Sequence, residues 1–186
     1  MNLNQLDGEH PTTTLKRLSP ALASAMAAYS TASYNYTRLS LREFEAARMR
    51  TALINGCTIC RGFRAARDVA EFSKAIGEDI GRHLVSRGTP PDEAFYEHIL
   101  SWSEADIYSP RERVAIELAE RMGLDPQSLA ADAPFWTRAS ELYSDEEIAD
   151  LVMAIGSWIA GGRVLHVLGL DTVCSADPEA ALSGNP

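Results

Sequence analysis

Apolar residues recur at helical spacing along most of the chain, and the strict alternation that marks a half-buried strand is absent. The first strong helix signal is the run Ser40-Leu41-Arg42-Glu43, which has the spacing of a capping box and is followed by apolar or small residues through Leu53. Asn55-Gly56 ends this predicted helix, because glycine readily adopts the left-handed conformation found at helix ends. A second helix is predicted to begin near Cys57 and to continue through Phe72.

The second half of the chain carries three more helix starts. They are Thr89-Pro90-Pro91-Asp92-Glu93, the capping box Ser109-Pro110-Arg111-Glu112, and Ser144-Asp145-Glu146-Glu147. An Ala-rich stretch from Leu15 to Tyr29 is a further helix candidate. The pattern therefore predicts an all-α protein of six to eight helices.

The predicted helices divide the chain into three parts. Residues 1–35 form an N-terminal extension that is partly helical, residues 36–171 form the main helical domain, and residues 172–186 form a small, polar tail that we expect to be flexible. A chain of 186 residues is long enough for one domain with a sizeable core and such an extension.

Composition and net charge indicate which classes of partner the protein is suited to bind. Apolar residues make up 46% of the chain and charged residues 23%, which is the balance of a soluble globular protein. A net charge of −9 argues against nucleic acid or an anionic membrane surface as a partner. The first ten residues lack the cationic and apolar segments of a secretory signal, so a reducing cytoplasm is the expected location.

The longest apolar segment runs from Ile148 to Leu170 and contains Gly161-Gly162, Arg163 and His166. A membrane span rarely carries that much polarity near its centre, so we expect a helix buried in a core or at a subunit contact. The glycines indicate close approach of a neighbouring backbone, which fits packing between subunits.

Cys57 and Cys60 are the strongest chemical signal in the chain. Two cysteines separated by two residues can close a disulfide across roughly one helical turn, and so small a ring stabilises a fold very little. In a reducing compartment, such a pair is usually catalytic or metal-binding. The spacing therefore favours cysteines that are oxidised and reduced in turn.

The residues around this pair follow a known pattern. Glu45 is followed, after eleven residues, by Cys57-Thr58-Ile59-Cys60, and the C-terminal half contains Ser109-Pro110-Arg111-Glu112-Arg113, the run 143–148, and Arg163 leading to Leu168-Gly169-Leu170. With these motifs, residues 36 to 171 resemble the alkylhydroperoxidase D-like proteins of the carboxymuconolactone decarboxylase family. The resemblance implies an all-helical protomer that assembles into a homo-oligomer, either a trimer or a hexamer.

The resemblance also implies a chemistry. The thiol pair Cys57 and Cys60 would reduce a small-molecule hydroperoxide or exchange with a protein disulfide, with Glu45 as the upstream carboxylate. An external thiol reductant would supply the electrons, because nothing in the chain indicates a flavin or nicotinamide site; no cofactor, metal, nucleic-acid or membrane partner is expected. Cys57, Cys60 and Glu45 are thus the predicted catalytic residues.

One position departs from the family pattern. The redox branch has a histidine four residues after the second cysteine, which passes protons, whereas this chain has Arg64. On a regular helix, Arg64 would lie one turn from Cys60 and could stabilise its thiolate. A guanidinium cannot take and return a proton near neutral pH, since its pKa exceeds about 12. We therefore expect weak peroxidase activity, with thiol–disulfide exchange better preserved.

Other interpretations stay open at this stage. Arg64 can instead belong to a solvated or subunit-contact stripe, and His166 can be a core histidine or a substitute proton carrier. A zinc site would need further ligands, which do not show the spacing of a zinc motif. The alternative functions are a cofactor-free decarboxylase-like enzyme and a non-enzymatic helical oligomer whose cysteines sense oxidation or are inert.

Overall fold

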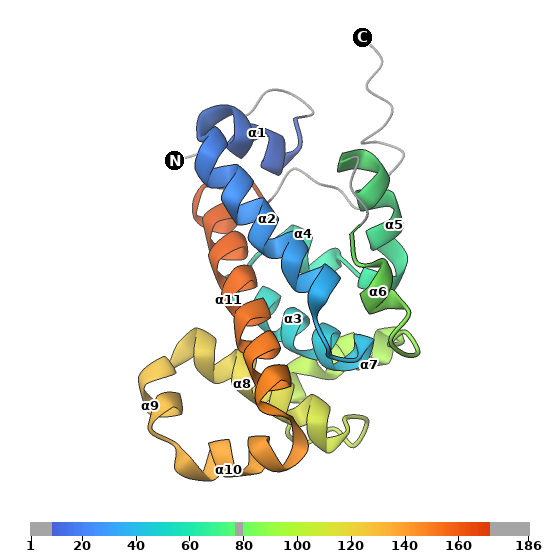
Figure 1. The fold of residues 1–186 in the computed structure, drawn as a ribbon, viewed down its shortest axis with the longest axis vertical. Coiled ribbons are helices and arrows are strands. Elements are labelled where there is room, and N and C mark those ends of the chain that lie inside the picture. The colour runs from blue at the N-terminus through green and yellow to red at the C-terminus, as the bar shows by residue number, and fades with distance from the viewer. Residues whose placement is uncertain (1–8, 77–79, 172–186) are drawn as a thin grey trace.

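The computed structural model describes residues 9–76 and 80–171, and the regular elements in these ranges are all helices (Figure 1). Seven of them span eight or more residues, which confirms the all-α prediction, and the others are short single turns. The predicted tail 172–186 lies outside the described residues. In chain order the elements are α1 (Pro11–Leu18), α2 (Pro20–Tyr36), α3 (Leu41–Asn55), α4 (Thr58–Gly62), α5 (Ala65–Ile76), α6 (Arg82–Val85), α7 (Glu93–Glu97), the 3-10 helix η1 (His98–Ser101), α8 (Pro110–Leu124), α9 (Pro126–Ala130), α10 (Ala133–Leu142) and α11 (Asp145–Val167).

The predicted start and stop of α3 are confirmed. The Ser40 hydroxyl accepts the Glu43 amide hydrogen, and the Glu43 carboxylate accepts the Ser40 amide hydrogen, which completes the capping box. Gly56 ends the helix in the left-handed conformation, with φ of 72°. The Ala-rich stretch forms two helices, α1 and α2, because Pro20 has no amide hydrogen and begins a new helix.

The predicted continuous helix from Cys57 to Phe72 is wrong. The chain leaves the helical conformation at Phe63, where ψ is 139°, so that α4 ends at Gly62 and α5 begins at Ala65. The Asp68 carboxylate accepts the Arg64 amide hydrogen at 2.7 Å, which helps to start α5 separately. Arg64 is therefore not one turn along the same helix from Cys60.

The helix predicted after Thr89 is shorter than expected. The Asp92 carboxylate caps α7 by accepting the Phe95 amide hydrogen, and after five residues the backbone continues as the 3-10 helix η1. This part still covers the core, because Phe95 and Ile99 are both buried.

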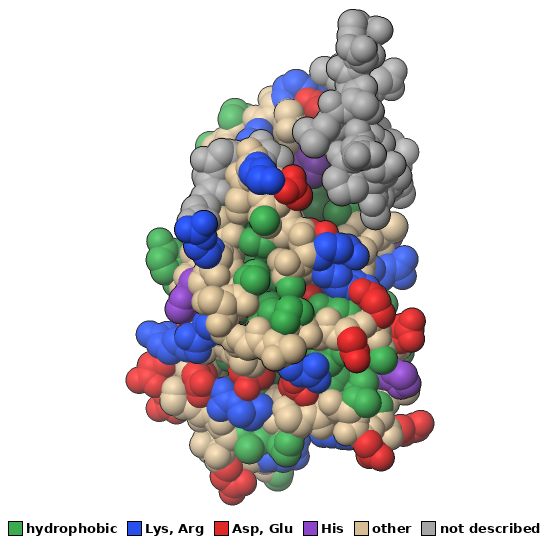
Figure 2. Space-filling model, turned by 90° about the vertical axis from the view of Figure 1, so that its right-hand side faces the viewer, with side chains coloured by type: hydrophobic (Ala, Val, Ile, Leu, Met, Phe, Trp, Pro, Cys, Tyr) green, Lys and Arg blue, Asp and Glu red, His purple; other side chains and the backbone are tan. Residues whose placement is uncertain are grey.

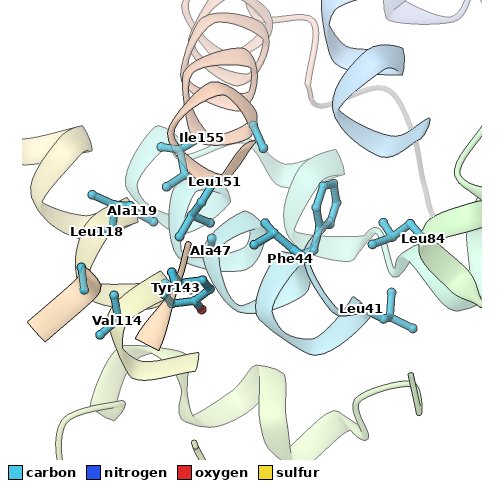
Figure 3. Close-up of a cluster of buried hydrophobic side chains, with 14 of the residues drawn as sticks. Leu41, Phe44, Ala47, Leu84, Val114, Leu118, Ala119, Tyr143, Leu151 and Ile155 are labelled. Atoms are coloured by element: carbon cyan, nitrogen blue, oxygen red, sulfur yellow. The ribbon is translucent and has the colours of Figure 1, made fainter. Parts of the chain in front are cut away.

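The main hydrophobic core lies where α3, α8 and α11 meet (Figure 3). Phe44, Leu118, Leu151 and Ile155 are each at most 1% exposed. Burying one such side chain contributes roughly 1.5–3 kcal/mol to folding. Leu84 of α6 belongs to the same cluster, and Figure 3 shows it on the Phe44 side of the core.

Reciprocal ion pairs join the starts of α3 and α8. Arg42 Nε lies 2.6 Å from the Glu112 carboxylate, and Arg111 Nε lies 2.5 Å from the Glu43 carboxylate. Glu43 and Glu112 are the capping-box residues of their helices, so each cap is tied to the neighbouring helix. Arg111 also binds Glu147, the capping-box residue of α11, at 2.8 Å. The same short motifs that begin these three helices thus also fix their relative placement.

Helix α2 packs along α11, and the two run side by side in Figure 1. The Tyr29 hydroxyl donates a hydrogen bond to the Met153 carbonyl at 2.7 Å. Helix α2 contains no charged residue, and Ala23 is its buried residue. Leu22, Met153 and Val167 are each more than half exposed, so apolar side chains remain open to solvent on this helix pair.

By length and composition alone, α11 could also cross a membrane, and 28% of its apolar window is buried within the structure. The core helix of a soluble protein can pass the same test, so this is weak evidence for a membrane span. On the face shown in Figure 2, acidic and basic side chains are intermixed over the lower part of the molecule.

Candidate functional site

Cys57 and Cys60 lie at the start of α4 and are joined by a disulfide, with their Cα atoms 5.3 Å apart. Cys57 is the N-cap residue, and its sulfur accepts the Cys60 amide hydrogen at 3.3 Å. Cys57 is 0% exposed, whereas Cys60 is partly exposed. A molecule in solution therefore meets Cys60 before Cys57.

Three arginines, Arg48, Arg64 and Arg67, bind the end of α4. Their guanidinium groups donate hydrogen bonds of 2.6 to 2.7 Å to backbone carbonyls that a short helix leaves without helical partners. Positive charge at this end also complements the helix dipole. Arg48 supplies two of these bonds, and the four acceptors are the carbonyl oxygens of Cys60, Arg61, Gly62 and Phe63.

Glu45 forms a buried ion pair with Arg48 next to α4. The side chains are 0% and 4% exposed, and two hydrogen bonds of 2.6 and 2.9 Å join them. Burial alone would lower the pKa of Arg48, but the charge and hydrogen bonds of Glu45 outweigh it and raise that pKa above its usual value. Glu45 is therefore connected to the cysteine helix through Arg48, whose guanidinium binds both the Glu45 carboxylate and the Cys60 carbonyl.

Tyr96 of α7 links this ion pair to Arg64. Its hydroxyl donates a hydrogen bond to Glu45 at 2.7 Å, and its ring lies 3.9 Å from the guanidinium carbon of Arg64. Burial and the neighbouring negative charge of Glu45 raise the pKa of Tyr96 well above its usual value, so the phenol stays protonated. Arg64 is further paired with Glu93 at 3.0 Å. The Arg64 side chain is thus held by Tyr96, Glu93 and backbone carbonyls.

The turn that carries the cysteines packs against α11. Asn55, the last residue of α3, donates a hydrogen bond to the Trp158 carbonyl at 2.8 Å and accepts one from Arg163 at 3.1 Å. A Cβ atom on Gly162 would lie 2.6 Å from the Asn55 amide nitrogen, so only glycine permits this approach. The close contact predicted from the glycines of α11 is therefore, at Gly162, a contact within one chain.

One turn further along α11, His166 lies over Gly56. A Cβ atom on Gly56 would be 3.1 Å from both Cε1 and Nε2 of the imidazole. The ring's Nδ1 is 2.9 Å from a carboxylate oxygen of Asp171, and the same oxygen accepts the Thr58 amide hydrogen at 3.1 Å. The side chain of His166 is 52% exposed, while that of Asp171 is 3% exposed. His166 and Asp171 thus connect the end of α11 to the residues on either side of Cys57.

The structure brings the predicted site residues into one region. Glu45 and Arg64 lie at the C-terminal side of α4, through Arg48 and Tyr96, and His166 lies at its N-terminal side, next to Gly56. Sequence reasoning missed Arg48, Tyr96 and Asp171. The spacing of three between Glu45 and Arg48 on a predicted helix could have indicated the first of these, because such residues are neighbours on a helix surface.

Other features of the described part of the chain lie elsewhere. A surface hollow of about 740 Å³ is lined by Trp102 and by residues of α8 and α10, among them Glu117 and Arg138, which pair with each other. The cysteines are not part of that lining. Within residues 9–76 and 80–171, no cluster of three or more His, Cys, Asp or Glu side chains is arranged to hold a metal ion.

One curated protein is similar to this chain in sequence. No family model matches the chain. An uncharacterised protein of Bacillus subtilis (strain 168), YdfG, is 28% identical over 127 residues, which are 67% of this chain and 72% of that protein.

Solved structures share the architecture. A protein of unknown function from Agrobacterium tumefaciens, provisionally named an antioxidant defence protein AhpD, superposes with a TM-score of 0.63 and 21% identity, covering 83% of this chain and 92% of that one. The apo debrominase Bmp8, and its cysteine-to-alanine variant in complex with 2,3,4-tribromopyrrole, each superpose with a TM-score of 0.65 and 19% identity, covering 92% of this chain and 80% of theirs. The chain therefore has the all-helical fold of the AhpD-like structures.

Proposed function

We propose that the protein is a thiol-dependent oxidoreductase that cycles Cys57 and Cys60 between a dithiol and a disulfide. The observation that carries the proposal is the pairing of a partly exposed Cys60 with a fully buried Cys57 in one turn of helix. A catalytic disulfide needs one sulfur that outside molecules can reach and a second that closes the ring afterwards. The likeness of the fold to an AhpD-like structure supports the same class.

In this proposal, the Cys60 thiolate attacks and Cys57 resolves. Attack on a disulfide R–S–S–R forms a bond between Cys60 and one sulfur and releases RS⁻. The Cys57 thiolate then attacks Cys60, closes the Cys57–Cys60 disulfide and releases the second RS⁻. An external thiol reductant restores both thiols. Arg48 and Glu45 act by holding α4 and its carbonyls in place.

Disulfides are the better substrates in this proposal, and hydroperoxides the poorer ones. Reducing a hydroperoxide requires a proton for the leaving oxygen, which general acids typically speed by about 10²–10⁴-fold. Arg64, at the position of the family's relay histidine, stacks on Tyr96 and pairs with Glu93, and its guanidinium does not transfer protons near neutral pH.

The test measures how fast the reduced protein reacts with an alkylating reagent across pH, before and after addition of a small disulfide or a hydroperoxide. We expect fast labelling at neutral pH that the disulfide abolishes and a reductant restores, with the hydroperoxide acting at least tenfold more slowly. Slow labelling that neither oxidant changes would instead favour inert cysteines. Activity on a lactone that survives replacement of both cysteines by serine would favour a decarboxylase-like enzyme.

We also propose that copies of the chain associate through α2 and α11, as a trimer or a hexamer. Helix α2 is uncharged, and Leu22, Met153 and Val167 leave apolar surface exposed along this helix pair. Sedimentation of the purified protein checks the prediction, since a single-chain mass at micromolar concentration would contradict it. The cytoplasm remains the location that suits a dithiol maintained by an external reductant.

A further inference from the structure

We infer that His166 is the base that removes the proton of the Cys57 thiol, and that Asp171 is the positioning residue that orients the imidazole for this step. The inference rests on the thiol chemistry proposed above and adds to it the residue that activates the resolving cysteine. No motif in the sequence connects Asp171 with the cysteines, because Asp171 lies 113 positions after Thr58, the residue next to Cys57.

The resolving cysteine needs such a base. Cys57 is 0% exposed, so bulk solvent does not reach its thiol to take the proton. Only the thiolate attacks a disulfide, so the ring-closing step waits until the Cys57 proton has left. Arg48, Arg64 and Arg67 bind carbonyls at the other end of α4, and Arg163, on the Cys57 side, is hydrogen-bonded to Asn55 and to the Gly123 carbonyl.

His166 is placed to accept this proton. The Cε1–Nε2 edge of its ring lies against Gly56, the residue before Cys57, and glycine leaves that approach open. The ring thus lies beside the residue that precedes the thiol, and in the inferred step Nε2 takes the Cys57 proton once the disulfide has been reduced. Because the side chain is 52% exposed, it can release the proton to solvent afterwards.

Asp171 determines which ring nitrogen of His166 is free to accept a proton. A carboxylate only accepts hydrogen bonds, so Nδ1 of His166, 2.9 Å from the carboxylate oxygen, carries the hydrogen, and Nε2 of the neutral ring is left as the base. Burial alone would raise the pKa of Asp171, but the hydrogen bonds from His166 and from the Thr58 amide outweigh burial and hold the pKa below its usual value. Asp171 is therefore ionised at neutral pH. Through the Thr58 amide it also fixes the ring relative to the start of α4.

The reaction balances as two steps. The Cys60 thiolate attacks the small disulfide R–S–S–R, giving the mixed disulfide and the first RS⁻. Cys57 then transfers its proton to Nε2 of His166, and its thiolate attacks Cys60, giving the Cys57–Cys60 disulfide and the second RS⁻. His166 acts only in the second step, which makes the inference separable from the proposed function.

The experiment follows both steps in the reduced protein with a chromogenic aromatic disulfide, in a Cys174→Ser background that leaves Cys57 and Cys60 as the thiols. In His166→Asn, we expect the first equivalent of RS⁻ to appear within twofold of the wild-type rate and the second to appear about 10²-fold more slowly. The mixed disulfide on Cys60 should accumulate, as mass spectrometry detects. Asp171→Asn should slow the same second phase by a smaller factor.

His83→Asn is the matched control, because His83 is an exposed histidine on α6 that contacts Arg87; both phases should keep their rates. Nitrogen-15 NMR of the imidazoles gives a readout besides reactivity: the neutral ring of His166 should carry its hydrogen on Nδ1 in the wild type and lose this preference in Asp171→Asn. A second phase of normal rate in His166→Asn, or a neutral ring protonated on Nε2, overturns the inference alone. A wild type that releases no RS⁻ overturns the proposed function together with it.

Discussion

Replacement of Cys60 by serine is expected to slow the reaction of the reduced protein with a small disulfide by about 10³-fold, whereas replacement of Cys57 should leave the first attack nearly unchanged. Cys57 is 0% exposed, so in the Cys60→Ser variant the remaining sulfur reacts only when the turn opens. A local opening that costs about 4 kcal/mol slows the reaction by about three powers of ten.

The two variants should also differ in their products. Cys57→Ser should stop at a stable mixed disulfide on Cys60, because no second thiolate closes the ring. Rates from stopped flow and masses from the quenched reaction measure both effects, with Cys174→Ser as the common background and reference. Equal rates for Cys57→Ser and Cys60→Ser would contradict the assignment of Cys60 as the attacking sulfur.

The sequence predicted the parts of the fold that depend on local chemistry. The capping boxes at Ser40, Ser109 and Ser144, and the glycine stop at Gly56, mark helix ends because the partners lie within a few residues of one another. The break at Phe63 was missed, since one of its causes, the contact with Arg48, comes from elsewhere in the chain and adds to the local Asp68 cap on the Arg64 amide. Arg48 of α3 holds the Phe63 carbonyl, and no local pattern around Phe63 indicates that contact.

The candidate site divides in the same way. Cys57 and Cys60 were predicted from their spacing and Glu45 from the family resemblance, and the structure places Glu45 in contact with Arg48, which binds the Cys60 carbonyl. Tyr96 lies 51 residues after Glu45, and its role follows only from the packing of α7 against α3. The spacing between Glu45 and Arg48 could have indicated their contact, whereas no spacing in the sequence indicates the contacts that Tyr96 and Asp171 make.

Replacement of Arg48 by methionine is expected to reduce the free energy of unfolding by about 3–5 kcal/mol, the usual cost of leaving one partner of a buried ion pair alone. Glu45 would keep a fully buried carboxylate with Tyr96 as its other hydrogen-bond partner, and the carbonyls of Cys60 and Phe63 would lose the donors that Arg48 provides. Urea unfolding of the oxidised protein measures the change. A loss below about 1 kcal/mol would contradict the claim that the buried Arg48–Glu45 pair stabilises this part of the fold.

A double-mutant cycle separates the charge from the carbonyl contacts. Glu45→Gln combined with Arg48→Met removes both charges, so the double variant should be more stable than Arg48→Met alone. The difference in unfolding free energy that remains between the double variant and the wild type then measures the loss of hydrogen bonds to the Cys60 and Phe63 carbonyls at the end of α4. Arg67→Met is the matched control: its side chain is 57% exposed and binds the Gly62 carbonyl, so it should cost at most about 1 kcal/mol. Arg48 and Arg67 both bind the end of α4. A much larger loss of unfolding free energy in Arg48→Met than in Arg67→Met would therefore assign the effect to the buried ion pair with Glu45. Through this pair, a carboxylate twelve residues before Cys57 supports the cysteine helix.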